Sequence, residues 1–591
     1  MPHYNAPLRD MRFTLFELHG GETLSKMPAY ESFTRDLIDS VLDEAAKVAE
    51  QVLQPINRAG DEEGCTFENG VVRTPKGMKA AYNLFREGGW TSVAADPVYG
   101  GQGLPYGVNT MIEEMICSAN LSFGMYPGLS HGAYKALHAY ASDDLKKRFL
   151  PKLVDGTWAG TMCLTEPHCG TDLGLMRTKA EPQADGSYKI SGTKIFISSG
   201  EHDLTENIIH LVLAKMPDAP KGIKGVSLFV VPKFLPKADS SLGARNGVAC
   251  ASIEHKMGIK ASATAVLNFD GATGWLVGEP HKGMRAMFTM MNTARLAVGM
   301  QGLGLAEASY QGAVAYAKDR LQGRALSGAK YPAKAADPII VHPDVRRMLL
   351  TQRAWIEGCR ALSGWGGKAL DEGKHHPDPA IREKADDLIA VITPVIKAFL
   401  TDMAFDVTNI GVQVFGGHGY IREYGMEQLV RDARITQIYE GTNGIQALDL
   451  VGRKMPASFG KNLRQVFHPI SAYIEQSIDK PGMAEFVEPL AKVFGRLQQA
   501  TGQVARVGLS KPDEAGAAAT DYLKLMGYTL VAYQWARMAE LSLPKQDDAF
   551  YKAKVATARF FMERLLPQAT AHFQAVMAGG KTMMEFEDAS F

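Results

Sequence analysis

Apolar positions recur every three or four residues over the first part of the chain, a spacing that predicts amphipathic helices. The pattern is clearest where eight positions would form one buried face: Phe33, Leu37, Ile38, Val41, Leu42, Ala45, Ala46 and Val48. Glycines are concentrated in residues 96–103, and we interpret this segment as a loop that can approach another group closely. Helical spacing resumes by Met111 and lasts to about residue 154, so the first part of the chain is predicted to be helical.

The period changes to that of strands between about residues 161 and 288. Four runs rich in β-branched and aromatic residues, separated by Gly, Asp and Pro, predict strands at 188–192, 194–198, 208–213 and 226–231. Helical spacing returns at Met291. The pattern therefore predicts a mostly α-helical chain with an inserted β domain.

These changes of pattern divide the 591 residues into segments. At about one to two hundred residues per domain, a chain of this length should hold roughly three or four domains. We predict an N-terminal arm (1–30), a helical domain (31–158), a β domain (159–288), a second helical domain (289–454) and a C-terminal helical domain (462–591). Within the second helical domain, a stretch rich in Gly, Pro, Ala and Lys that begins at Gly323 predicts a long loop.

The composition excludes several classes of protein. The 64 Lys and Arg balance the 64 Asp and Glu, so no overall field would attract nucleic acid or an anionic membrane. From Lys461 onward, 15 basic residues stand against 14 acidic ones. The six cysteines are scattered without a C-x-x-C pair, which is typical of free thiols in a reducing compartment. We therefore expect a cytoplasmic protein with no nucleic-acid partner and no metal.

Two regions bear on export and membrane insertion. Arg9, Asp10 and Arg12 interrupt the apolar residues near the start, so we expect no signal peptide. The most apolar stretch, 388–400, spans about thirteen residues, and at that length it is too short to cross a bilayer. It also contains Pro394. We expect a buried helix there and no membrane span.

Two motifs have an ordinary alternative explanation. Residues 128–132 fit the G-x-S-x-G pattern of a hydrolase, but no buried strand precedes them, so we favour a bend between two helices with Ser130 capping the second. His375 and His376 are metal-ligand types, yet H-E-x-x-H and its relatives are absent. We expect these histidines to be solvated.

Two further segments combine glycine with hydrogen-bonding groups. Residues 162–172 lie where helices give way to strands, which suits either a planar cofactor or an ordinary capped turn. Residues 413–420 contain Gln413 and three glycines, so the backbone can approach a phosphate or simply form a flexible turn. The residues alone leave both pairs of alternatives open.

The segment 431–443 places Glu440 beside Ile438 and Tyr439. A carboxylate that loses hydration next to apolar neighbours and an apolar ligand has a raised pKa and becomes a better base. The alternative is a solvated acid at a helix start, stabilised by the helix dipole.

These three segments, in this order and separated by helix, strand and helix, resemble the acyl-CoA dehydrogenase family of flavoenzymes. The matching residues are Leu164 to Pro167 with Gly170 to Asp172, then Gln413 to Gly419, then Ile438 to Thr442. The resemblance spans about residues 31–454. It implies an α domain, a β-barrel domain and a four-helix α domain, to which this chain adds a C-terminal helical domain.

The resemblance also implies non-covalently bound FAD. Leu164 and Thr165 match positions that contact the flavin, while Phe196 and Ser198 match the strand that covers the other side of the ring. Thr442 matches a further FAD contact. Four positions match contacts to the FAD of a neighbouring subunit: Arg320, Gln413, Gly416 and Gly417. A homodimer is then needed to complete each cofactor site.

Glu440 matches the catalytic base of the short- and medium-chain members of the family. Other branches place the base immediately before the position of Arg295, where this chain has Ala294. Arg295 and Thr171 match positions near the CoA, and Tyr439 precedes the base and is expected at the substrate. Arg295 could equally pair with a nearby acid as a structural arginine.

The implied reaction converts an acyl-CoA thioester to the trans-2-enoyl-CoA. Glu440 removes an α-proton, a hydride passes from the β-carbon to flavin N5, and electron-transfer flavoprotein accepts the electrons. The family stabilises the enolate with the backbone N–H of the base and a ribityl hydroxyl of FAD.

The ends of the chain resemble a longer bacterial branch that includes 3-methylmercaptopropionyl-CoA dehydrogenases. We therefore expect conversion of 3-methylmercaptopropionyl-CoA to methylthioacryloyl-CoA, with a medium- or long-chain fatty acyl-CoA dehydrogenase of β-oxidation as the alternative. Extra C-terminal helices would cover the surface that shorter members use to form tetramers, which predicts a dimer. A DNA-associated flavoprotein of the same superfamily is disfavoured because the tail is nearly neutral.

Overall fold

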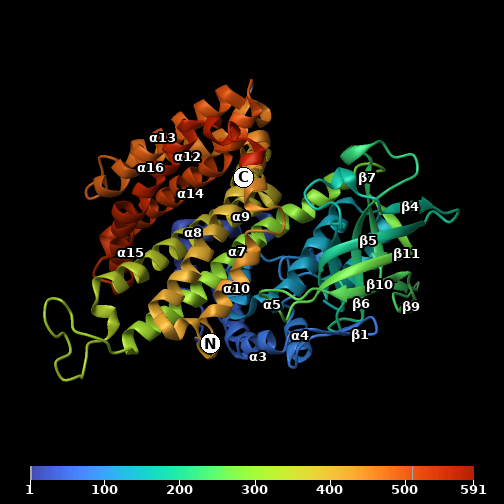
Figure 1. Ribbon diagram of the computed structural model, residues 1–591, viewed down its shortest axis with the longest axis horizontal. Coiled ribbons are helices and arrows are strands. Elements are labelled where there is room, and N and C mark those ends of the chain that lie inside the picture. The colour runs from blue at the N-terminus through green and yellow to red at the C-terminus, as the bar shows by residue number, and fades with distance from the viewer. Residues whose placement is uncertain (1–2, 238, 509) are drawn as a thin grey trace. The chain divides into compact units, whose positions relative to one another are not determined.

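The computed structural model describes residues 3–237, 239–508 and 510–591. It forms two compact units. The helical unit comprises Met1–Ala46, Pro105–Ser118 and Val298–Phe591, and the sheet-bearing unit comprises Lys47–Leu104 and Ala119–Ala297. Figure 1 shows all the labelled strands within the sheet-bearing unit.

Seven strands form the main sheet: β3 (Trp158–Cys163), β4 (Lys179–Pro182), β5 (Tyr188–Ser198), β6 (Asn207–Lys215), β7 (Val226–Pro232), β10 (Val248–Ile253) and β11 (Thr264–Val277). The pairings run from β11 through β5, β4, β6 and β7 back to β11, so these five strands close into a barrel. β3 pairs with β6 in parallel and β10 pairs with β11 in antiparallel fashion. The inserted β domain is confirmed.

Two strands of the barrel are buried on both faces. β6 and β7 are buried along almost their whole length, as near-continuous apolar strands are when both faces are covered. One face contributes to a core that includes Phe149 and Trp158, whose rings lie 6.2 Å apart. The other contributes to a core with Phe229 and Phe269. Two small hairpins complete the strands: β1 (Thr66–Glu68) with β2 (Val71–Arg73), and β8 (Phe234–Pro236) with β9 (Leu242–Arg245).

The helices of the sheet-bearing unit are α3 (Asn57–Glu63), α4 (Met78–Glu87) and α6 (Asp143–Val154). The chain passes between the two units within α2 (Arg35–Val48), α5 (Tyr106–Tyr140) and α7 (Gly283–Asp319), and also between Leu104 and Pro105, just before α5.

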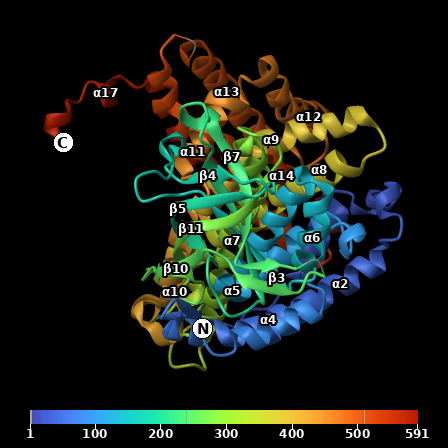
Figure 2. The ribbon, with the colours of Figure 1, turned by 90° about the vertical axis from the view of Figure 1, so that its right-hand side faces the viewer.

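The other helices belong to the helical unit: α1 (Leu8–Arg12), α8 (Pro343–His375), α9 (Pro379–Phe415), α10 (Met426–Thr436), α11 (Asn443–Asp449), α12 (Lys461–Ser477), α13 (Ala484–Gly508), α14 (Pro512–Ser542), α15 (Ala549–Phe560), α16 (Ala569–Ala578) and α17 (Lys581–Met584). In Figure 2 the segment with α17 extends away from the neighbouring helices of this unit, and its side chains are exposed. The predicted helical blocks from Met291 and from residue 462 onward are confirmed.

One helix among the described residues is long and apolar enough to cross a membrane, the helix over Pro379–Tyr420 that contains α9. Its most apolar 18-residue window has a mean hydropathy of 1.8 and is 78% buried inside the protein. The expected buried helix at 388–400 is therefore confirmed. The helix is longer than the thirteen-residue apolar stretch predicts, because α9 continues through Pro394 and has 37 residues in all.

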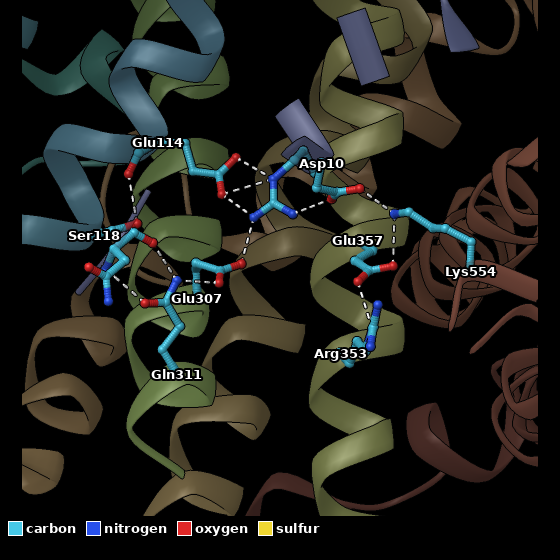
Figure 3. A network of polar contacts seen from close by, with 10 residues as sticks. Asp10, Glu114, Ser118, Glu307, Gln311, Arg353, Glu357 and Lys554 are labelled. Atoms are coloured by element: carbon cyan, nitrogen blue, oxygen red, sulfur yellow. Dashed lines mark hydrogen bonds and ion pairs between the residues drawn. The ribbon is translucent and has the colours of Figure 1, made fainter. Parts of the chain in front are cut away.

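A buried network of charges joins both ends of the chain to the centre of the helical unit (Figure 3). Arg360 on α8 donates to Asp10 and Glu307 at 2.6 Å and to Glu114 at 3.0 Å. Lys554 on α15 pairs with Asp10 from the C-terminal helices. All five side chains are almost completely buried. Because a buried charge without a partner is costly, the N-terminal arm and the C-terminal helices are held to α8 together.

The structure corrects two details of the helical pattern. Leu37 lies on the exposed side of α2, whereas Ile38 and Leu42 are buried as expected. Within α5 the bend occurs at Asn120, whose side chain accepts a hydrogen bond from the N–H of Phe123 at 3.0 Å.

Ser130 does not cap a helix and does not form the nucleophile elbow of a hydrolase. It lies inside α5, where its hydroxyl donates to the carbonyl of Tyr126 at 3.0 Å and accepts from the N–H of Gly160 at 3.0 Å. The hydrolase alternative is therefore wrong.

The structure also corrects the strand pattern. Residues 188–192 and 194–198 form one strand, β5, because Gly192 continues the extended chain with a register shift opposite β11 instead of turning. The hairpin β1–β2 was missed although Asn69 and Gly70, both with positive φ, are a typical hairpin turn.

Candidate active site

The loop after β3 is organised around a buried carboxylate. Glu166 accepts hydrogen bonds from the N–H of Arg177 at 2.7 Å and from the N–H and hydroxyl of Thr178 at 3.1 and 2.6 Å. It also contacts Lys194 of β5 at 2.9 Å, and that lysine donates to the carbonyl of Leu164 at 2.9 Å. The side chains of Glu166 and Lys194 are 3% and 0% exposed. The pair therefore fixes the loop onto β5.

The ionisation of this pair follows from its surroundings. Burial alone would raise the pKa of Glu166, but the charge of Lys194 and the hydrogen bonds from Thr178 and Arg177 lower it to about 2. Burial also lowers the pKa of Lys194, and the attraction of Glu166 opposes this without reversing it. Glu166 is therefore a charged anchor at neutral pH.

His168 and Cys169 lie close to Glu166, and one ligand-type atom from each falls within 4.8 Å of the others. Within the described residues this is the one such group. Glu166 and Cys169 form a backbone bridge, and the Glu166 carboxylate is already held by Lys194. We interpret the group as part of the loop and not as a metal site.

The predicted flavin contacts of the sheet-bearing unit lie together at this loop. The N–H of Ile195 donates to the carbonyl of Thr165 at 2.9 Å, which joins the loop to β5 beside Phe196. Phe196 has φ of +57° and is 60% exposed. Such a backbone is a true outlier for a bulky residue, and it presents an aromatic ring at the surface instead of in the core. Ser198, two residues on, is half-buried.

Two other predicted residues of this unit are Thr171 and Arg295. Thr171 is exposed in the same loop, two residues before a short 3₁₀ turn begins at Leu173. Arg295 lies on α7 and is 4% exposed, with one guanidinium nitrogen 3.3 Å from the side-chain oxygen of Asn292 and its charge 5.8 Å from the ring of Phe288. A buried guanidinium with a polar partner on its own helix fits a structural role as well as a ligand contact.

In the helical unit the end of α7 is joined to the end of α9. Tyr316 stacks on Phe415 with ring centroids 4.1 Å apart, and its hydroxyl shares a hydrogen bond of 2.8 Å with His418. The N–H of Arg320 donates to the carbonyl of Tyr316 at 2.8 Å. The structure thus brings Arg320 close to the segment 413–419.

The glycines of that segment have different roles. At Gly416, with φ of +59°, and at Gly417, an added Cβ would meet nothing within 4 Å among the described residues. At Gly419 it would overlap the carbonyl oxygen of Val412. Gln413 is exposed, as are Gly416 and Gly417. Gly419 therefore serves the fold of the turn, whereas the other two leave open space beside Gln413.

Glu440 lies at the turn between α10 and α11. It has φ of +59°, a conformation that costs a non-glycine residue about 1–3 kcal/mol and often occurs at functional sites. The side-chain amide of Gln446 donates to the carbonyls of Glu440 and Gly441 at 3.3 and 3.2 Å. Glu440 is half-buried. The chain therefore holds this residue in a strained turn.

The neighbours of Glu440 are less apolar than expected. Ile438 is 46% exposed, so within this chain it does not shield the carboxylate from water. Tyr439 donates its hydroxyl to Gln301 of α7, and burial raises the pKa of Tyr439 well above the usual range, with a further rise from the charge of Glu440. Thr442 caps α11 by accepting from the N–H of Ile445 at 3.4 Å.

Three residues that shape these loops were missed from the sequence. Lys194 stands at a buried position of β5, and a lysine at an inward position of a strand is itself a signal for a buried ion pair. Asp402 and Asn443 hold the turn that carries Glu440. Asn443 was within the third segment, but no spacing rule connects it to Asp402.

Each unit, taken by itself, exposes groups that suit part of a flavin dinucleotide. The hydroxyls of Thr165 and Ser198 and the guanidinium of Arg320 have no hydrogen-bond or ionic partner among the residues that the structure describes. Half-exposed hydroxyls beside an exposed aromatic ring can bind and cover a planar ring system. An arginine and open glycines can bind a pyrophosphate. The residues present therefore fit FAD.

Four family models match the chain in succession. They are the acyl-CoA dehydrogenase N-terminal domain at residues 38–157, the middle domain at 161–272, the C-terminal domain at 281–455, and the acetyl-CoA dehydrogenase C-terminal-like domain at 466–587. The worm protein ACDH-11 of Caenorhabditis elegans, solved with C11-CoA, has the same fold: its TM-score is 0.77 at 18% identity, over 96% of this chain and 92% of that one.

Two relatives are similar over their whole length. The 3-methylmercaptopropionyl-CoA dehydrogenase of Ruegeria pomeroyi is 43% identical over 98% of this chain and 99% of its own. A butyryl-CoA dehydrogenase of Syntrophomonas wolfei is 36% identical over 100% of this chain and 99% of its own. The chain therefore belongs to the acyl-CoA dehydrogenase family, FAD-dependent oxidoreductases that act on CH–CH bonds.

Proposed function

We propose that this dehydrogenase acts on 3-methylmercaptopropionyl-CoA and forms methylthioacryloyl-CoA. The observation that carries this choice of substrate is the 43% identity to the Ruegeria enzyme over nearly the full length of both chains. That similarity includes the N-terminal arm and the C-terminal helices, which the 36%-identical butyryl-CoA dehydrogenase also matches. Straight-chain acyl-CoA thioesters are therefore the second candidate.

We assign the role of catalytic base to Glu440. Its position in a strained turn, with its backbone carbonyl bound by Gln446, supports this role because the backbone that carries the carboxylate is held in one place before substrate arrives. An α-proton beside a thioester is too weakly acidic for a free carboxylate to remove, so the site must also stabilise the enolate. We assign the backbone N–H of Glu440 to that task.

FAD, when bound, supplies the acceptor for the hydride that leaves the β-carbon. The residues of this chain bind and orient it. Thr165 and Ser198 would donate hydroxyl hydrogen bonds to the flavin, and Leu164 and Phe196 would cover its faces. Thr442, which caps α11 after Glu440, is proposed as a further FAD contact.

Substrate contacts are proposed for three residues. Tyr439 lies next to the base, and its hydroxyl is already fixed by Gln301, so its ring would form part of the wall of the acyl site. Thr171 and Arg295 would contact the CoA portion. Glu440 is half-buried in the chain alone, so substrate and cofactor themselves must exclude the remaining water around the carboxylate.

We also propose a homodimer, because Arg320, Gln413, Gly416 and Gly417 are exposed and would bind the FAD of the partner. Electron-transfer flavoprotein would reoxidise the enzyme in the cytoplasm. Light scattering of the purified protein should give twice the mass of one chain. A monomer that retains full FAD would contradict the dimer.

The division into an arm, three core domains and a C-terminal domain at residues 30, 158, 288 and 454 is part of the same proposal. The succession of matched family domains supports it, because their ends fall near these positions.

A panel of acyl-CoA thioesters tests the substrate assignment. We expect kcat/KM to be highest for 3-methylmercaptopropionyl-CoA and lower for butyryl-, octanoyl- and palmitoyl-CoA, measured with an artificial electron acceptor. A maximum at any straight-chain thioester, with the thioether substrate at least tenfold poorer, would assign the enzyme to fatty acid β-oxidation instead.

A further inference from the structure

The turn that carries Glu440 is closed by its own ends. The N–H of Asn443 donates to the carbonyl of Gln437 at 3.0 Å, which leaves five residues between them with Glu440 among them. The side-chain amides of the same two residues then converge on one atom. Gln437 donates to Oδ1 of Asp402 at 2.8 Å, and Asn443 donates to the same oxygen at 2.7 Å.

The orientation of the Asn443 amide is determined by its partners. Lys397, whose side chain is completely buried, donates to Oδ1 of Asn443 at 2.8 Å, and an ammonium group can only donate. Asp402 can only accept when it is charged, so the amide nitrogen of Asn443 must face it. Thr401 lies 2.9 Å from that nitrogen and accepts from it as well. The side-chain amide of Asn443 can therefore make all of these hydrogen bonds in only one orientation.

Asp402 belongs to α9, and its other oxygen faces the C-terminal helices. Oδ2 lies 4.0 Å from the ammonium group of Lys524 on α14. Asp406 lies one turn further along α9. Burial and the charge of Asp402 raise the pKa of Asp406, and the same lysine lowers it by a smaller amount. The two aspartates thus share a helix and a cation, but only Asp402 accepts the hydrogen bonds from both ends of the turn.

We propose that Asp402 is a positioning residue for the catalytic base: it holds Gln437 and Asn443, the two ends of the turn, and so fixes the carboxylate of Glu440 against the substrate. This inference rests on the proposed role of Glu440. Hydrogen bonds to a charged acceptor are about twice as strong as neutral ones, and a misplacement of about 1 Å at a reacting group can cost 10²-fold in rate.

Anaerobic flavin reduction by saturating acyl-CoA tests the proposal on the FAD-loaded enzyme. We expect Asp402→Ala to slow reduction by about 10- to 100-fold, with bound FAD and the KM for substrate changed less than about threefold. Asp402→Asn should recover most of the rate, because its amide oxygen still accepts from both side chains. The matched control is Asp406→Ala, which should reduce its flavin within about twofold of the wild-type rate.

Hydrogen exchange of a peptide spanning 437–446 provides a readout that does not depend on activity. Asp402→Ala should speed exchange in this peptide, and Asp406→Ala should not. If exchange rises in Asp402→Ala while flavin reduction keeps the wild-type rate, or if Asp402→Ala and Asp406→Ala behave alike, the proposal is overturned. If flavin reduction in Glu440→Gln keeps the wild-type rate, Glu440 is not the base, and this conclusion does not depend on the results for Asp402.

Discussion

Replacing Lys194 by methionine tests how the loop after β3 is anchored. Methionine fills nearly the same space, so the main change is the loss of the ammonium group 2.9 Å from Glu166 and from the carbonyl of Leu164. Removing one partner of a buried ion pair costs about 3–5 kcal/mol. Glu166 keeps its hydrogen bonds from Arg177 and Thr178, so we expect the lower end, about 3 kcal/mol.

Urea titration of the FAD-free protein, followed by hydrogen exchange in peptides of β5 and β6, measures this cost for the sheet-bearing unit. At about 3 kcal/mol per molar urea, the midpoint of Lys194→Met should fall by about 1 M. The matched control is Lys189→Met on the same strand, since Lys189 is exposed and, among the described residues, donates only to the hydroxyl of Thr273. Its midpoint should stay within about 0.2 M of wild type.

A second replacement identifies the cause of the loss. Adding Glu166→Gln to Lys194→Met removes the remaining buried charge, so the double variant should be more stable than Lys194→Met alone. Equal midpoints for Lys194→Met and Lys189→Met, or a double variant as unstable as the sum of the single changes, would refute the reasoning.

The pH dependence of the same unit has a defined sign. The folded-state pKa of Glu166 is about 2, below its ordinary value of 4.5. Its contribution to stability is therefore fully present above about pH 4.5 and is lost as the pH falls towards 2. In Lys194→Met, burial acts without the opposing cation, so the folded-state pKa of Glu166 rises and the stability lost between about pH 4.5 and 2 should be smaller than in the wild type.

Two further predictions concern the helical unit. Arg360→Met leaves the buried carboxylates around Asp10 without their guanidinium, which should lower the free energy of unfolding by about 3–5 kcal/mol. Limited proteolysis should therefore cut the N-terminal arm faster than in the wild type. The control is Arg347→Met, an exposed arginine on the same helix, which should not speed the cleavage. Gly419→Ala should lower the thermal midpoint because its Cβ overlaps the Val412 carbonyl, whereas Gly417→Ala should keep the midpoint and lower FAD retention. Equal cleavage rates, or equal midpoints for the two alanine variants, would contradict these assignments.

Local patterns predicted the fold well wherever local interactions decide it. Ile38 and Leu42 are buried on α2 because helical spacing alone sets which face is apolar. The bend of α5 was placed near Ser130 and lies at Asn120, whose cap on Phe123 was overlooked. The pattern predicts two separate strands at 188–192 and 194–198, yet pairing with β11 keeps the chain extended through both.

Long-range partners could not be predicted in this way. The spacing of residues indicates that Lys194 points inward, but not that Glu166, 28 residues earlier, will neutralise it. Asp402 lies on a long apolar helix, and only the folded chain brings it to both Gln437 and Asn443. The candidate base was found because it lies within a short motif that resembles a known family.

The most direct test of the central claim is anaerobic reduction of the bound flavin by 3-methylmercaptopropionyl-CoA in Glu440→Gln. We expect the variant to remain yellow with a full complement of FAD, while the rate of bleaching falls by at least about 10³-fold because no group is left to accept the α-proton. Bleaching at the wild-type rate would show that another residue removes the proton and would contradict the account.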